Sequence, residues 1–198
     1  MIEVVEKEGK TEEELLSSVN LDDVHYKIEE IPGKLFKGKK YLIKTIEKQA
    51  IRNFIKEFIN NLGLSMNKKI NTEIRYNDDC YFVMLIGDDN SILIGKDGRT
   101  LNSIQLLLHQ AINNKTGFNI RINVDAANYK TNKEKRLERE IKVLAKEVLD
   151  TKVEVKLDPM NSYERRIVHN VIGNFKNLQS ESFGEDPSRY IVISYKED

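Results

Sequence analysis

The sequence predicts an α+β fold made of several small domains. Apolar residues recur with strand and helix periodicity in short, alternating stretches. Prolines and glycines break these stretches, notably at Pro32-Gly33, Gly63 and Pro159. Charged residues make up 32% and hydrophobic residues 39% of the 198 residues, which suits small domains with much surface. We expect three domains and one connecting segment, with the boundaries 1–46, 47–125, 126–151 and 152–198.

The first domain is predicted to be a small β-α-β-β unit. Residues 2–7 form the expected first strand, and Thr11 begins a short acidic helix, with Glu14 closing a capping box. Two further strands are expected at 24–31 and 41–46. The second domain has the expected order α-β-β-α-α-β. Its elements are a helix at 46–62 ended by Gly63, a hairpin of strands 70–76 and 81–86, a helical turn at 91–94, a helix at 101–112 and a strand at 118–124.

The C-terminal third of the chain begins with a connecting segment, 126–151, that contains a charged helix. Basic residues alternate there with glutamates, so we interpret this helix as a solvated spacer. The last domain is expected to be α/β. A strand at 153–157 precedes a helix that Asn161 caps with Glu164, and a final strand covers 190–195.

Composition argues against a membrane-spanning protein and against a metal or cofactor site. No apolar run approaches the ~20 residues of a membrane span, and the first residues carry acids without an apolar leader, so we expect no stable membrane insertion. The single cysteine, Cys80, suits the cytoplasm. The histidines His25, His109 and His169 are too widely spaced to suggest a metal site, and no cofactor is expected. Net charge is zero, so any nucleic-acid binding must depend on local geometry.

The segment Ile94-Gly95-Lys96-Asp97-Gly98-Arg99 is the first candidate site. Its two glycines leave a turn without Cβ atoms, which lets a sugar-phosphate backbone approach closely. The helix that follows directs free backbone N–H groups at the turn, and Lys96 and Arg99 add positive charge. The plain alternative is an ordinary joint between two helices. The carboxylate of Asp97 would repel phosphate, although Lys96 and Arg99 can offset it.

Arg165 and His169 are the second candidate site. Their i,i+4 spacing puts both side chains on one face of the predicted helix. Arginine offers a planar fork for phosphate, and histidine can stack on a base or donate to phosphate. On spacing alone, an ordinary amphipathic helix with an exposed Arg and His is the better explanation of the pair, and the sequence around it favours a binding site.

Both segments resemble known nucleic-acid-binding domains. With the element order around it, the glycine loop resembles that of a type II KH domain, where such a loop clamps about four nucleotides. The positions carried over are Ile94, Gly95, Lys96, Gly98 and Arg99. The stretches 158–169 and 182–193 resemble the R-3-H domain, which is associated with single-stranded nucleic acids, and Arg189 is its matching basic residue after the acidic loop.

The order of the three domains resembles the bacterial Jag, or KhpB, family over nearly the whole chain. That family usually carries a Lys-Lys-Gly-x-x-Gly-x-Gly stretch in its N-terminal domain. Here the comparable region, 32–40, has fewer glycines. The resemblance implies post-transcriptional regulation affecting cell elongation, division and envelope assembly. It also implies a small single-KH-domain protein as partner, and it leaves homo-oligomerisation open.

We therefore expect a cytoplasmic protein that binds single-stranded RNA and is not an enzyme. No nucleophile–base pair, metal cluster or pair of acids stands at a suggestive spacing. The main alternative is a protein–protein adaptor at the division or membrane-insertion machinery. Single-stranded DNA is the alternative ligand, since only contacts to the 2′-hydroxyl would distinguish RNA.

Overall fold

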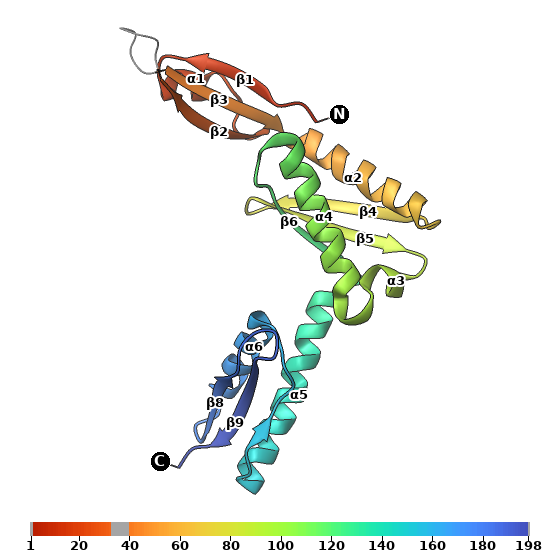
Figure 1. Ribbon diagram of the computed structural model, residues 1–198, viewed down its shortest axis with the longest axis vertical. Helices are drawn as coiled ribbons and strands as arrows, with labels where there is room; N and C mark the ends of the chain where they lie inside the picture. The colour runs from red at the N-terminus through yellow and green to blue at the C-terminus, as the bar shows by residue number, and fades with distance from the viewer. Residues whose placement is uncertain (1, 33–39, 198) are drawn as a thin grey trace. The chain divides into compact units, whose positions relative to one another are not determined.

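The computed structural model describes residues 2–32 and 40–197. The chain divides into two compact units, Met1–Ala127 and Asn128–Asp198. Two three-stranded sheets belong to the N-terminal unit and a third to the C-terminal unit (Figure 1). None of the helices in the described ranges has the length and apolar character needed to cross a membrane.

The first sheet is antiparallel and has β3 in its centre, in the order β1-β3-β2. Helix α1 packs on it through Leu15, which is buried against Gly9; a Cβ at Gly9 would lie 2.7 Å from Leu15 Cγ. Thr11 Oγ1 accepts the Glu14 N–H, as the predicted cap requires. The Glu14 carboxylate accepts the Lys10 N–H, whereas a capping box would have it accept the Thr11 N–H. The elements are β1 (Val5–Gly9), α1 (Glu12–Ser17), β2 (Val24–Ile31) and β3 (Lys40–Glu47).

The second sheet has the order β4-β5-β6, with β4 and β5 antiparallel and β5 and β6 parallel. Its element order, α-β-β-α-α-β, is the predicted one. Asp78 and Asp79 both have positive φ, as a two-residue turn between β4 and β5 requires. The elements are α2 (Lys48–Ser65), β4 (Ile70–Asn77), β5 (Cys80–Gly87), α3 (Asn90–Ile94), α4 (Arg99–Thr116) and β6 (Arg121–Ala126).

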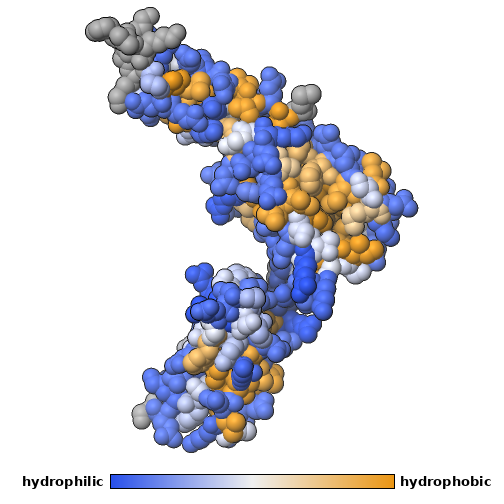
Figure 2. Space-filling model, viewed as in Figure 1, coloured by the Kyte–Doolittle hydropathy of each residue, from blue (hydrophilic) through white to orange (hydrophobic). Residues whose placement is uncertain are grey.

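Helices α2 and α4 cover one face of this sheet. Along β5, Tyr81, Val83 and Leu85 are buried toward the helices, whereas Phe82 and Ile86 are exposed on the opposite face. The helices contribute buried residues at i, i+3, i+4 spacing: Ile51, Ile55 and Ile59 from α2, and Leu101, Ile104, Leu108 and Ile112 from α4. Figure 2 shows hydrophobic residues gathered over α4 and the β4–β6 sheet.

Gly63 does not end α2, contrary to the sequence prediction. The helix continues to Ser65, and Gly63 is buried within it. A Cβ at Gly63 would lie 2.7 Å from the Lys68 carbonyl oxygen, and the Lys68 N–H donates to the Gly63 carbonyl at 2.8 Å. The glycine is therefore explained by a close approach of the chain as it turns toward β4.

The two sheets of the N-terminal unit are joined without a loop, because β3 ends at Glu47 and α2 begins at Lys48. Beside this junction, His25 Nε2 of β2 and the Tyr81 hydroxyl of β5 share a 2.9 Å hydrogen bond. The Tyr81 hydroxyl also donates to the Lys48 carbonyl at 3.3 Å. The Lys27 ammonium lies over the Phe118 ring, 5.5 Å from its centroid. These contacts hold the first sheet against the second.

The C-terminal unit packs two helices on a sheet of order β7-β9-β8. Helix α6 begins with the predicted capping box of Asn161 and Glu164. The core joins α5 to α6 and the sheet through Ile141, Ala145, Val148, Val168, Ile172, Ile191 and Ile193. The elements are α5 (Tyr129–Thr151), β7 (Val155–Lys156), α6 (Ser162–Ile172), β8 (Leu178–Phe183) and β9 (Tyr190–Tyr195).

Two features of this unit differ from the sequence analysis. Helix α5 is not a solvated spacer, because its apolar face is part of the core while its charged face is exposed. Strand β8 was not predicted, since Gln179, Ser180, Glu181 and Ser182 form a polar run. In the N-terminal unit, residues 33–39 of the region comparable to the family's glycine stretch, 32–40, lie outside the described residues.

Candidate nucleic-acid interface

The predicted glycine loop connects α3 to α4 and contains three residues with positive φ. Gly95 has φ +70° and ψ −178°, and Gly98 has φ +81°. Asp97 has φ +56°, a left-handed conformation that aspartate tolerates better than most residues. The Gly98 N–H donates to the Gly95 carbonyl, which closes the turn.

Gly95 is required by the packing of the loop as well as by its backbone. A Cβ at this position would lie 2.1 Å from Thr100 Oγ1 and 2.8 Å from Thr100 Cβ. Any larger residue would therefore move the first turn of α4. A substitution at Gly95 would therefore change the shape of the loop, so a loss of affinity for a ligand could not be assigned to a lost contact.

The loop presents its charged side chains to solvent. Lys96, Asp97 and Arg99 are exposed, Ile94 is half-buried and Gly98 is buried. Within the described part of the chain, Lys96 and Arg99 form no ion pair, and no side chain caps α4. The N-cap of this helix is Gly98, and the Arg99 N–H donates to the Lys96 carbonyl, so an anion would meet the start of the helix at the N–H groups after Arg99. Two cations and uncapped amides thus surround a turn that carries a single carboxylate.

Arg165 is buried rather than displayed. Its side chain is 9% exposed, and its Nη1 donates to Asp186 Oδ1 at 3.0 Å and to the Met160 carbonyl at 2.8 Å. The guanidinium therefore ties α6 to the segment before it and to the loop between β8 and β9. A phosphate at Arg165 would have to compete with Asp186.

His169 lies one helical turn after Arg165 and faces β8. Its Nδ1 is 2.7 Å from Ser180 Oγ, and its Nε2 is 3.1 Å from Ser182 Oγ. The ring is half-buried, and both nitrogens have hydroxyl partners. These two serines were missed in the sequence analysis; the signal for them is the alternation of Leu178, Ser180 and Ser182 along β8.

Arg189 completes the group in the C-terminal unit. Its carbonyl accepts the Met160 N–H at 3.0 Å, so Met160 contacts both Arg165 and Arg189. The Arg189 Nε is buried and has no hydrogen-bond partner among the described residues. An unpaired buried donor is costly, so a ligand oxygen that reached this atom would relieve that cost. The structure thus brings the three predicted residues Arg165, His169 and Arg189 to one end of the β8–β9 hairpin.

The sequence also matches known families over both segments. The profile of the KhpA/KhpB KH domain matches residues 52–124, and that of the R-3-H domain matches residues 135–195. The chain is 36% identical to RNA-binding protein KhpB of Clostridium symbiosum over 180 residues, which cover 88% of this chain and 81% of that protein. The chain belongs to the KhpB family.

Other KhpB proteins match to different extents. RNA-binding protein KhpB of Bacillus subtilis is 30% identical over 164 residues, or 82% of this chain and 79% of that protein. The Lactiplantibacillus plantarum KhpB matches over 105 residues at 33% identity, or 53% of this chain and 33% of that protein. The R-3-H match starts within α5, in agreement with the packing of that helix in the C-terminal unit. The predicted family and its KH and R-3-H domains are confirmed.

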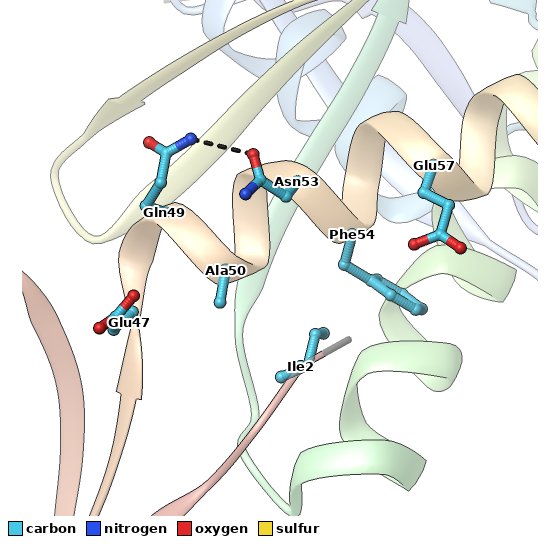
Figure 3. Close-up of a pocket in the computed structure, with 7 residues that line it drawn as sticks. All are labelled: Ile2, Glu47, Gln49, Ala50, Asn53, Phe54 and Glu57. Carbon is cyan, nitrogen blue, oxygen red and sulfur yellow. Dashed lines mark hydrogen bonds between the residues drawn. The ribbon is translucent and has the colours of Figure 1, made fainter.

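A further pocket of about 230 Å³ lies beside the start of α2, away from the glycine loop (Figure 3). Ile2 closes one side of it, Phe54 points into it, and Glu47 and Glu57 give it an acidic rim. Gln49 donates to Asn53 Oδ1 at 3.0 Å along the same helix. An acidic rim repels phosphate, so we do not assign this pocket to the candidate nucleic-acid interface.

Proposed function

We propose that this chain binds single-stranded RNA through the glycine loop of its KH domain and a second site in its R-3-H domain. The observation that carries the proposal is the loop geometry, with exposed Lys96 and Arg99 beside the uncapped start of α4. The relatives that carry the name RNA-binding protein KhpB support it. The loop amides and cations hold phosphates, and Ile94 contacts a base.

The second site contributes through effective concentration. Arg165, His169 and Arg189 lie together at one end of the β8–β9 hairpin, where Arg189 Nε has an unused donor. Two weak sites on one chain bind a single RNA more tightly than either site alone, provided that the RNA spans both. We propose that the protein acts in this way as a cytoplasmic, non-catalytic post-transcriptional regulator that affects cell elongation, division and envelope assembly.

The proposed protein partner is a small single-KH-domain protein. The profile that matches residues 52–124 covers KhpA as well as KhpB proteins, which supports a common KH surface. An adaptor function is the second candidate, and one observation favours it. Phe82, Met84 and Ile86 line the outer face of β5, and two of them are exposed apolar residues. Such a stripe suits a protein partner.

The test is fluorescence anisotropy of a labelled, unstructured RNA of about 30 nucleotides titrated with the full chain at several salt concentrations. Lys96→Ala/Arg99→Ala should weaken binding and lower the slope of log K against log salt by roughly 1.4. This variant is preferable to a change at Gly95, which would distort the loop.

The control is Lys142→Ala/Lys146→Ala, which removes the same charge from exposed positions on α5. An equal loss in both variants would mean that net charge, not the loop, governs binding. DNA of the same sequence separates the two nucleic acids, because equal affinity would exclude a contribution of the 2′-hydroxyl. If RNA does not bind at all, the adaptor function takes its place, and Phe82→Ser/Ile86→Ser should then release the protein partner.

A further inference from the structure

The outer face of the C-terminal sheet carries two aromatic side chains and a lysine that are separate from Arg165 and His169. Side chains alternate along a strand, so the buried Ile191 and Ile193 mark the face that packs on the helices. Ser180 and Ser182, which bond to His169, share that inner face. Phe183 and Tyr190 are directly paired and lie on the outer face, where Phe183 is 43% exposed.

Two aromatic rings and one cation meet there. The Phe183 and Tyr190 rings are stacked, with centroids 6.1 Å apart and planes 29° from parallel. The Lys156 ammonium lies 4.1 Å from the Tyr190 centroid. Within the described residues it has no carboxylate within ion-pair distance. Near-parallel rings with a positive charge at one side are the combination that holds an unpaired base and its phosphate.

The surroundings favour a nucleotide over a protein. Lys156 and Glu181 both pair with Val192, so Glu181 stands two strands from Lys156, about 10 Å away. Gln179 and Ser194 continue the same face as a polar pair and share a 3.1 Å hydrogen bond. On the described strands β8 and β9, Val192 is thus the single aliphatic neighbour of the rings on this face. The polar residues around the rings leave too little apolar area for a protein-docking surface.

The position of the rings links them to the second site. Phe183 follows Ser182, the partner of His169, and Tyr190 follows Arg189. Because β8 is the edge strand of its sheet, RNA at the end of the hairpin can reach both faces. We propose that Phe183, Tyr190 and Lys156 form a base-stacking subsite for single-stranded RNA, in which a base stacks on Phe183 and Lys156 faces a phosphate. This inference depends on the proposed function.

The absence of tryptophan from the sequence allows a direct test. In Phe183→Trp the only indole of the full chain stands in the subsite, and a stacked base quenches its fluorescence. Phe82→Trp is the matched control, since Phe82 is 41% exposed on the outer face of the β4-β5-β6 sheet. Each variant is titrated with an unlabelled RNA of about 30 nucleotides, while anisotropy of the labelled RNA reports binding.

We expect saturable quenching of Phe183→Trp and none of Phe82→Trp. Phe183→Leu keeps an apolar side chain without a π-face, and it should weaken binding about fivefold or more. Thermal unfolding of Phe183→Leu shows whether the loss is one of fold. An anisotropy change without quenching of the indole in Phe183→Trp would overturn the subsite and leave the proposed function standing. Absence of binding in every variant and in the wild type would overturn both.

Discussion

The guanidinium of Arg165 is held inside the C-terminal unit by Asp186 and the Met160 carbonyl. Asp186 is itself 68% exposed, so the pair lies at the edge of the unit. Asp186 occupies the place where a phosphate would meet Arg165. In the unbound protein, this carboxylate balances the charge of a buried cation whose other partner, the Met160 carbonyl, is neutral.

Asp186→Asn should therefore strengthen RNA binding. Asparagine keeps the acceptor for Arg165 Nη1 but loses the negative charge, so phosphate competes more easily for the guanidinium. We expect up to about fivefold tighter binding, equivalent to about 1 kcal/mol, by anisotropy. Glu185→Gln removes a neighbouring charge from the same exposed loop and is the control. The same gain in both variants, or weaker binding by Asp186→Asn, would contradict competition at Arg165.

Individual residues were predictable only in part. Helical spacing was enough to put Arg165 and His169 on one face of α6. Their partners come from β8 and from the loop after it, and no periodicity within the helix indicates them. Gly95 was attributed to the approach of a sugar-phosphate backbone, whereas the structure adds a second requirement, the contact with Thr100. Whether these residues bind RNA stays a prediction.

At the scale of the elements, patterns repeated within one segment were reliable. The alternation at 70–76 and the apolar run at 81–86 predicted the β4–β5 hairpin, and the charged helix expected within 126–151 is α5. Strand β8 was missed because its inward positions carry Ser180 and Ser182, which bond to His169 instead of packing in the core. The role of α5 was misinterpreted because a helix pattern does not reveal which core receives it.

Helix α2 gives a prediction in which the usual effect of a substitution is reversed. Glycine to alanine inside a helix normally stabilises by up to about 1 kcal/mol. Gly63→Ala should instead lower the free energy of unfolding by about 1–3 kcal/mol, because the new Cβ meets the Lys68 carbonyl oxygen. Urea unfolding measures this, and Asn60→Ala, at an exposed position of α2, should be neutral or stabilising. A more stable Gly63→Ala would show that the turn toward β4 can relax.

At the scale of the whole N-terminal unit, His25 makes the joint between the two sheets sensitive to pH. Burial lowers the pKa of His25, the Lys48 ammonium lowers it further, and Asp79 opposes them. Around His25, burial raises the pKa of Tyr76 to about 12 and also raises the pKa of Tyr81, so both hydroxyls stay protonated near neutrality. Protonation of His25 is thus harder in the folded protein than in the unfolded chain.

The sign of the pH effect follows from that difference. The contacts of neutral His25 contribute fully to the free energy of unfolding above the unfolded pKa of histidine, about 6.5. That contribution falls as the pH drops below this value, because the unfolded chain takes up the proton more readily. We expect wild-type unfolding free energy to decline more than that of His25→Gln between about pH 7.5 and 5.5. Tyr76→Phe is the control, since it keeps the ring beside His25 without the hydroxyl. Identical pH profiles of wild type and His25→Gln would rule out this role.

The direct passage from β3 into α2 also restricts how this molecule can vary in length. Each residue of an α-helix turns the chain by about 100°. One residue inserted between Glu47 and Lys48 would therefore rotate Ile51, Ile55 and Ile59 away from the second sheet, or pull β3 out of register with β2. Insertions and deletions at this point are excluded by geometry, although the junction is partly exposed and carries charged residues. Length changes during the evolution of such chains must fall elsewhere.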